Sequence, residues 1–273
     1  MPEIEINGLN LAYMDQGSGP PIVAIHGWGS NKNVWRPQID AFSRAHRFIA
    51  IDIPGHGDSG RPDGDHFYSP AACADMTCAL MDRLGLDRAV LLGQSMGTFV
   101  SQLIYHSDPR RVIALVLTGA LSRSPPAGKI AGIWVEDIVR EIARRGIKDY
   151  LDDNVRFWFS PGFDPARIEE TTAERYKLAA HAAIAYCRAV AVLDIRDRLG
   201  EIRVPTLIIV GSEDGRTPVE ESELMNRGIP DAWLKVIKGA GHLVNVEQPE
   251  AFNQPVLDFI NTICQASGSL RRG

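Results

Sequence analysis

The chain of 273 residues has few cysteines, no excess of basic residues and no long apolar run. Its four cysteines, at positions 73, 78, 187 and 264, show neither the paired spacing of a zinc site nor the density of a disulfide framework. We therefore expect free, mostly buried thiols and no zinc site. The 29 Lys and Arg residues against 34 Asp and Glu residues give a net charge of −5, which disfavours nucleic acid as a partner.

The longest apolar runs, at residues 112–117 and 206–210, are far shorter than the ~20 residues that a membrane-spanning helix needs. We therefore expect no membrane segment. The first residues lack the basic start and the apolar stretch of a secretory signal, which favours a cytoplasmic location. With 45% hydrophobic and 23% charged residues, the composition is that of a folded globular protein. Nothing in the sequence decides the oligomeric state.

Short apolar runs alternate with longer segments of helical period, the pattern of strands joined by crossover helices. Several runs are continuously apolar, which indicates strands buried on both faces. The sequence thus predicts an α/β fold with a mostly parallel, doubly wound sheet. The predicted strands are residues 9–14, 22–25, 48–51, 89–92, 112–117, 206–210 and 233–237. The predicted helices are residues 34–45, 70–84, 96–106, 219–227 and 249–264, two of which begin at Pro70 and Pro249.

From residue 121 to residue 203 the alternation stops, and only amphipathic stretches without a strand-like run remain. This block predicts a helical cap, residues 121–203, inserted into a core domain of residues 1–120 and 204–273. Inside the cap, Asp164 before Pro165 is typical of a helix start. Thr171 and Glu174 have the spacing of a capping box and predict a helix over residues 176–192.

A G-x-S-x-G pattern, Gly93-Gln94-Ser95-Met96-Gly97, lies between a predicted strand and a predicted helix. A serine at such a tight turn has a strained backbone, and the two glycines let the strand and the helix approach closely. The turn exposes the Ser95 hydroxyl and directs the amide of Met96 at the position of a developing oxyanion. We therefore predict Ser95 as a nucleophile.

A nucleophilic serine needs a base and a carboxylate that orients the base. His242 lies in the glycine-flanked loop after the last predicted strand, and Asp214 directly follows the strand at 206–210. Because the carboxyl ends of parallel strands meet at one edge of a sheet, we expect both side chains near Ser95. Three other carboxylates remain alternatives to Asp214 as the acid: Glu213, Asp194 and Asp197.

A second oxyanion donor is expected from the loop His26-Gly27-Trp28-Gly29, whose glycines allow the Trp28 amide to turn inward. We interpret His26 as a hydrogen-bonded organiser of this loop. Asp52 and His56 lie four residues apart in a loop broken by proline and glycine, so we expect structural hydrogen bonds there and no metal.

Aromatic residues are frequent in the predicted cap and indicate an apolar, partly enclosed pocket over the strand ends. Individual members of this set also have to pack against the core domain. We assign substrate contacts to Trp28, Trp134, Trp158 and Leu243.

These motifs, in this order and spacing, resemble the α/β-hydrolase superfamily over nearly the whole chain. The resemblance implies Ser95 as nucleophile, His242 as base, Asp214 as orienting acid, and the Trp28 and Met96 amides as the oxyanion hole. The stretch Gly241-His242-Leu243-Val244-Asn245 and the residues up to Phe252 resemble 3-oxoadipate enol-lactonases and related carboxylesterases. Thr98 departs from the pattern, since many members have a further glycine there.

The predicted function is cofactor-free hydrolysis of a small carboxylic ester or lactone with an apolar portion, through an acyl-enzyme. Relatives with the same triad cleave carbon–carbon bonds in ring-cleavage products, act as haloperoxidases or perhydrolases, or oxygenate heterocycles. A ligand receptor on the same fold is the non-enzymatic alternative. The motifs do not separate these functions, because fold and triad do not define the substrate.

Overall fold

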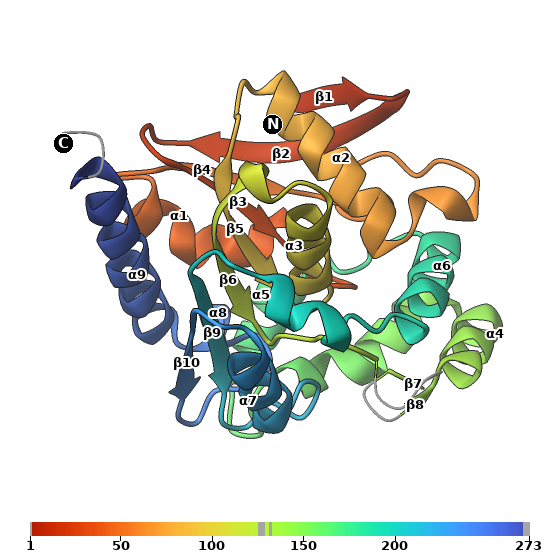
Figure 1. The fold of residues 1–273 in the computed structure, drawn as a ribbon. Helices are drawn as coiled ribbons and strands as arrows, with labels where there is room; N and C mark the ends of the chain where they lie inside the picture. Colours follow the sequence, from red (N-terminus) through yellow and green to blue (C-terminus); the bar gives the residue numbers. More distant parts are fainter. Residues whose placement is uncertain (1, 125–128, 131–132, 270–273) are drawn as a thin grey trace.

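The computed structural model describes residues 2–124, 129–130 and 133–269. These residues form a central eight-stranded sheet with helices around it (Figure 1). The strand order is β1-β2-β4-β3-β5-β6-β9-β10, with β1 and β2 antiparallel to their neighbours and all other pairs parallel. The strands are β1 (Glu3–Ile6), β2 (Leu9–Gln16), β3 (Pro21–Ile25), β4 (Arg47–Ile51), β5 (Ala89–Gln94), β6 (Val112–Thr118), β9 (Thr206–Gly211) and β10 (Ala232–Ile237).

All seven strands predicted from apolar runs are confirmed, each within two residues at both ends. The central strands β3, β5, β6 and β9 are buried along almost their whole length, as continuous hydrophobicity predicted. Strand β1 was not predicted. Its sequence alternates glutamate with isoleucine, and it lies at the sheet edge, where only one partner strand is needed.

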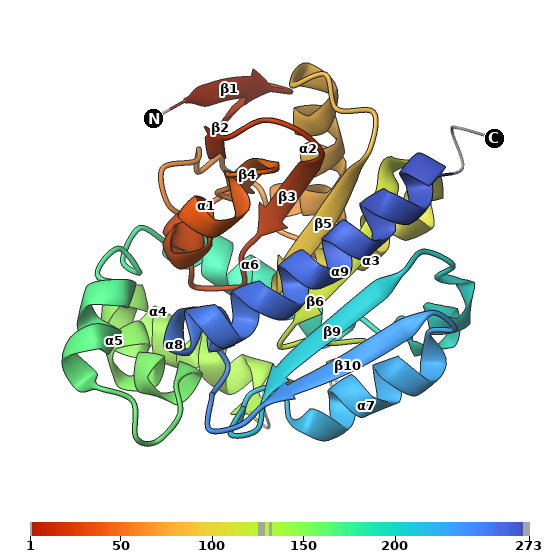
Figure 2. The same cartoon turned by 90° about the vertical axis from the view of Figure 1, so that its left-hand side faces the viewer.

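Helices cover both faces of the sheet (Figure 2). Helix α9 crosses one face and packs against α1, while α2 and α3 pack together on the opposite face. The core helices are α1 (Arg36–Phe42), α2 (Pro70–Arg83), α3 (Met96–Ser107), α7 (Val219–Gly228), α8 (Val244–Glu247) and α9 (Pro249–Ser269). Helices α2 and α9 begin at the two prolines that predicted their starts, and the Ser69 hydroxyl caps α2 by accepting from the Ala72 amide.

Three helices of the inserted segment lie together beyond the carboxyl ends of the central strands (Figure 2): α4 (Val135–Asn154), α5 (Pro165–Thr172) and α6 (Ala180–Ala191). Helix α5 begins as predicted, with Asp164 capping it through the Ala166 amide. The segment also contains a short antiparallel strand pair, β7 (Lys129–Ile130) with β8 (Ile133–Trp134), so the prediction that it has no strands was wrong.

The predicted helix at residues 176–192 begins later, at Ala180, and the predicted capping box is absent. Residue Thr171 is instead the penultimate residue of α5. The Glu174 carboxylate accepts a hydrogen bond from the Asn33 side chain of the core, so a tertiary contact replaces the local cap.

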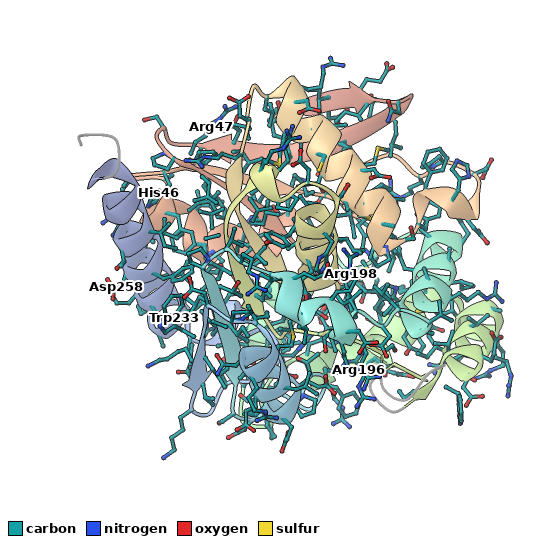
Figure 3. The ribbon with its side chains drawn as sticks, in the orientation of Figure 1. His46, Arg47, Arg196, Arg198, Trp233 and Asp258 are labelled. Carbon is teal, nitrogen blue, oxygen red and sulfur yellow. The ribbon has the colours of Figure 1, made fainter. Side chains whose placement is uncertain are left out.

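Strand β10 forms the other edge of the sheet and packs against α7. Its Trp233 side chain, labelled in Figure 3, meets Phe259 of α9 edge-on with ring centroids 5.7 Å apart. Within the described ranges, no helix has the length and apolar character required to cross a bilayer. All four cysteines are free, and Cys73 and Cys187 are buried, as predicted.

Candidate active site

Ser95 lies in the sharp turn between β5 and α3 and has left-handed backbone angles, φ 52° and ψ −119°. Only one other non-glycine residue in the described part of the chain has a positive φ. The flanking glycines permit this turn: a Cβ at Gly93 would meet the Gly97 carbonyl, and one at Gly97 would meet the Ile25 carbonyl. The predicted elbow is therefore present, with its strain imposed by close strand–helix packing.

His242 and Asp214 are brought together by the loops that follow β10 and β9. The Nδ1 atom of His242 lies 2.8 Å from Oδ2 of Asp214, and both residues are buried. Asp214 also accepts the Thr217 hydroxyl at 2.6 Å and the Thr217 amide at 2.8 Å. Nδ1 therefore carries the proton that faces the carboxylate, and Nε2 is left as the basic nitrogen.

Burial alone would raise the pKa of Asp214, but the charge of His242 and hydrogen bonds from His242 and Thr217 outweigh it. The net result is a pKa below the ordinary value. Asp214 thus stays ionised at neutral pH, as an orienting acid must. The alternatives predicted from sequence lie elsewhere: Glu213 is exposed, and Asp194 pairs with Arg196 at 2.5 Å.

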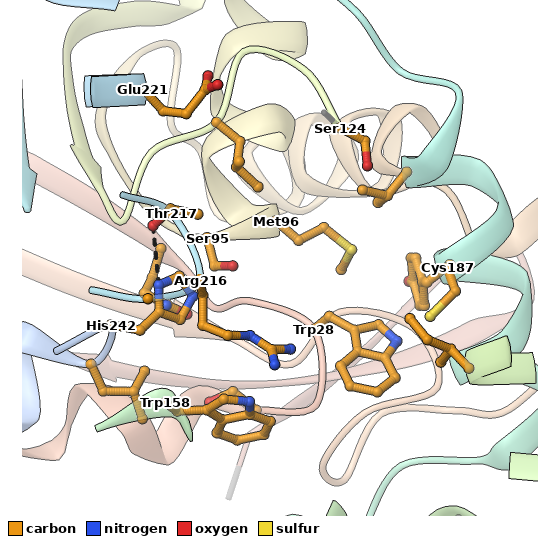
Figure 4. A pocket seen from close by; sticks show the side chains of 18 of the residues that line it. Trp28, Ser95, Met96, Ser124, Trp158, Cys187, Arg216, Thr217, Glu221 and His242 are labelled. Carbon is orange, nitrogen blue, oxygen red and sulfur yellow. Dashed lines mark hydrogen bonds between the residues drawn. The ribbon is translucent and has the colours of Figure 1, made fainter. Parts of the chain in front are cut away.

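Ser95 and His242 face the same cavity (Figure 4). The Ser95 amide donates to the Thr118 carbonyl at the end of β6, and the next residue, Gly119, lies directly against the His242 ring. No hydrogen bond joins the Ser95 hydroxyl to His242 within the described residues. Such bonds are often long without substrate and shorten in the substrate complex.

The loop after β3 lies next to the elbow. The Gly27 amide donates to Oε1 of Gln94 at 3.0 Å, and a Cβ at Gly27 would meet the Ser95 side chain. The Trp28 amide has no hydrogen-bond partner among the described residues, and the Met96 amide opens helix α3, where helices leave amides unpaired. Neither amide is engaged elsewhere among the described residues, which an oxyanion donor requires.

Two buried histidines hold this loop in place. His26 donates from Nδ1 to the Gly27 carbonyl at 2.7 Å and accepts from the Ile53 amide at 3.2 Å. His56 accepts from the Gly29 amide at 3.2 Å. Burial lowers the pKa of His26 to about 4 and that of His56 to about 3, so both rings are neutral at pH 7. His26 thus organises the loop, as predicted.

These lowered pKa values predict a loss of stability in mild acid. An unfolded histidine takes up a proton near pH 6.5, whereas the folded ones resist it down to about pH 4 and pH 3. The contribution of the two rings to the free energy of unfolding is therefore fully present above pH 6.5. It decreases as the pH falls, by about 2 kcal/mol per histidine at pH 5. Urea denaturation at pH 7, 6 and 5 measures this slope.

The variant His56→Gln should remove the contribution of His56, about 2 kcal/mol between pH 7 and pH 5, because glutamine still accepts from the Gly29 amide but does not titrate. The same change at exposed His66 is the matched control and should leave the slope as in the wild type. Equal unfolding free energies at pH 7 and pH 5 would contradict this role for the two rings.

Asp52 and His56 do not form a joint site. Asp52 accepts from the Lys32 ammonium and the Lys32 amide, both at 2.6 Å, and from the Asp58 amide at 2.8 Å. No metal-binding cluster of His, Cys, Asp or Glu occurs in the ranges that the structure covers. The fully buried Lys32, which the sequence analysis did not single out, thus ties the loop after β3 to the loop after β4.

Glu247 joins the His242 loop to the inserted segment. Its carboxylate accepts from the Gly241 amide at 2.9 Å and from the Ser160 hydroxyl at 2.6 Å. The Leu243 amide donates to the Trp158 carbonyl at 3.0 Å. The position of His242 therefore depends on the packing of the segment above it.

The cavity has a volume of about 310 Å³ and lies between the strand ends and the helices α4 and α6. Of the predicted substrate contacts, Trp28, Trp158 and Leu243 line it. The Trp28 indole donates to the Ala183 carbonyl of α6 at 3.1 Å. Further wall residues that the sequence analysis did not assign are Leu121, Ile138, Tyr150, Tyr186, Cys187, Val190, Arg216, Thr217 and Glu221.

The predicted contact of Trp134 with substrate was wrong. Trp134 precedes α4, is 54% exposed and is not part of the cavity wall. The sequence placed it correctly in the inserted segment but could not tell which helix face points at the core. Thr217 was detectable in principle, because it follows Asp214 by three residues, the spacing at which a side chain caps a turn.

A strained serine between strand and helix and an Asp–His pair after the following strands define an α/β-hydrolase type of protein. The chain belongs to the alpha/beta hydrolase fold family, which matches residues 20–249. The expected resemblance to enol-lactonases is confirmed: 3-oxoadipate enol-lactonase 2 from Acinetobacter baylyi is 30% identical over 91% of both chains.

Two further relatives show the range of this family. A 2-hydroxy-6-oxo-2,4-heptadienoate hydrolase from Pseudomonas putida is 30% identical over 93% of both chains. The solved structure of a thermophilic esterase from Thermogutta terrifontis aligns with a TM-score of 0.87 and 26% identity, covering 96% of this chain and 99% of that one. Similar chains therefore carry different hydrolase names.

Proposed function

We propose that the protein is a serine hydrolase that cleaves a small carboxylic ester or lactone through an acyl-enzyme. The observation that carries this proposal is the buried Asp214–His242 hydrogen bond at the wall of the cavity that the strained Ser95 also lines. The esterase and enol-lactonase names of two relatives support the same reaction class. We further propose that residues 121–203 act as the cap and residues 1–120 and 204–273 as the core domain.

In the proposed reaction, Nε2 of His242 takes the proton of the Ser95 hydroxyl, whose oxygen attacks the carbonyl carbon. The Trp28 and Met96 amides bind the oxyanion of the tetrahedral intermediate. The intermediate collapses and the C–O bond breaks, with the leaving alkoxide taking the proton from His242. A water molecule, deprotonated by the same nitrogen, then attacks the acyl-enzyme and releases the acid. Asp214 keeps the imidazole in the required tautomer throughout.

The cavity suits a small substrate with an apolar portion. Trp28, Trp158 and Leu243 supply aromatic and aliphatic surface, and a volume of about 310 Å³ is at the lower end of the range for small-molecule sites. Trp28 would act twice, with its backbone amide on the oxyanion and its indole as part of the wall.

Labelling with a fluorophosphonate tests the nucleophile directly. We expect one covalent adduct on the peptide that contains Ser95, because only a serine beside a base reacts with this probe. Ser30, another serine of the cavity wall, gives the matched control: Ser30→Ala should still be labelled and Ser95→Ala should not. Folded protein that leaves Ser95 unlabelled would contradict the proposal and favour a ligand receptor.

Carbon–carbon bond hydrolysis is a second candidate, supported by the 30% identity to the heptadienoate hydrolase. In that reaction the same groups would add water to a ketone. Rates on a p-nitrophenyl ester and on a vinylogous diketone, measured side by side, separate the two reactions. A kcat/KM higher on the diketone would replace the ester assignment.

A further inference from the structure

Arg216 is the one arginine in the wall of the proposed active-site cavity, as far as the structure describes the chain. It lies two residues after Asp214, and its backbone amide donates to Oδ1 of Asp214 at 2.8 Å. Figure 4 shows its guanidinium directed into the cavity, between the indoles of Trp28 and Trp158. The backbone that orients the proposed catalytic acid therefore also positions a cation beside the reacting centre.

The guanidinium of Arg216 has no protein partner in the described ranges. No carboxylate of the described residues lies within 4 Å of it, and none of its side-chain nitrogens makes a hydrogen bond to them. Other partly buried arginines differ: Arg175 binds Asp152 at 2.7 Å and Arg47 binds Asp15 at 2.7 Å. None of the guanidinium nitrogens is fully buried without a hydrogen-bond partner. These nitrogens are therefore accessible from the cavity.

An unpaired, partly desolvated cation is unfavourable, and a matching anion removes that penalty. Burial lowers the pKa of Arg216, but the group stays charged at neutral pH. The acidic residue in the same wall, Glu221, is already within 3.6 Å of Arg123. Since a guanidinium presents parallel N–H donors that match two carboxylate oxygens, the missing partner has the chemistry of a carboxylate.

Arg216 also lines a second, outer groove with Phe157, Phe159 and Phe163. It thus lies where the inner cavity meets the groove that surrounds it. A group bound there would sit at one end of a substrate whose reacting carbonyl is at Ser95.

We propose that Arg216 binds a carboxylate of the substrate, so that the preferred substrate is an ester or lactone that bears a second, non-reacting carboxylate. This inference rests on the proposed ester or lactone hydrolysis. Arg216 is a substrate-binding residue in this scheme and takes no part in proton transfer.

Matched esters test the selectivity. One is the mono-p-nitrophenyl ester of glutaric acid, which has a free carboxylate, and the other is its analogue with a carboxamide in place of the carboxylate. We expect the wild type to prefer the carboxylate ester. Arg216→Gln should lower the ratio of the two kcat/KM values roughly 10- to 100-fold, mostly through KM. Arg216→Lys should retain part of the preference, because it keeps the charge but loses the paired donors.

Arg156→Gln is the matched control, because it removes the same charge from the outer groove alone. A similar fall in the ratio for Arg156→Gln would indicate general attraction of anions and would overturn the assignment to Arg216. So would a wild type without preference for the carboxylate ester.

Binding of glutarate, measured by calorimetry on Ser95→Ala protein, separates this inference from the function on which it rests. We expect binding that is lost when Arg216→Gln is added to Ser95→Ala, and equal binding by both proteins would overturn the inference. Absence of fluorophosphonate labelling and of ester turnover would contradict the serine hydrolase proposal alone, because glutarate binding needs no nucleophile.

Discussion

Replacement of Ser95 by alanine is expected to lower kcat for ester hydrolysis by about 10⁴- to 10⁶-fold. The hydroxyl oxygen is the atom that forms the acyl-enzyme in the proposed reaction, and alanine has no atom to replace it. Steady-state kinetics on a p-nitrophenyl ester, with an active-site titration of the wild type, measure the loss. KM or substrate binding should change far less, since the cavity wall is otherwise intact.

The fold should tolerate this substitution. Ser95 makes no side-chain hydrogen bond in the described part of the chain, and its strained φ of 52° is set by backbone packing around Gly93 and Gly97. Thermal unfolding of Ser95→Ala should therefore match the wild type within a few degrees. A folded variant that retains more than a few per cent of the activity would refute the acyl-enzyme mechanism.

The second large effect is expected for Asp214→Asn, which should lower kcat by about 10³- to 10⁴-fold. An asparagine amide can donate to Nδ1 of His242 and so stabilise the tautomer that protonates Nε2, which can then no longer accept the serine proton. The neutral amide also no longer stabilises the imidazolium that forms in the transition state. Steady-state kinetics on the same p-nitrophenyl ester measure this loss, and the acidic limb of the kcat/KM profile, where a general base loses activity through protonation, should shift.

Glu213→Gln is the matched control for Asp214→Asn. Glu213 is the preceding residue on the same loop and is exposed, so the same chemical change there should alter kcat less than about threefold. Comparable losses in the two variants would mean that the loop as a whole, rather than the Asp214–His242 pair, is needed. Thermal unfolding distinguishes a misfolded variant from an inactive one.

The core of the fold could be predicted from sequence because its signals are local and strong. Continuous apolar runs such as those of β5 and β9 suffice to identify buried strands, and Pro70 and Pro249 mark helix starts through the loss of a single donor. The elbow belongs to the same class, since both glycines that permit it lie within two residues of Ser95.

The inserted segment was harder to predict because its helices have few local constraints. The predicted cap of α6 at Thr171 and Glu174 failed because Glu174 binds Asn33 of the core. The apolar Trp134 was expected in the pocket, yet it is half exposed at the start of α4. For Glu174, a long-range contact that no nearby residue indicates outweighed the local pattern.

The sequence by itself determined the order of the strands along the chain, the strained serine turn and the identity of the residues that follow β9 and β10. Only the tertiary structure decided that Asp214, rather than Asp194 or Asp197, contacts His242, and that Arg216 points into the cavity without a partner. The physical reason is the distance along the chain over which each interaction acts. Backbone strain and strand burial are properties of a few consecutive residues, whereas the direction of a side chain in a loop depends on packing against distant elements.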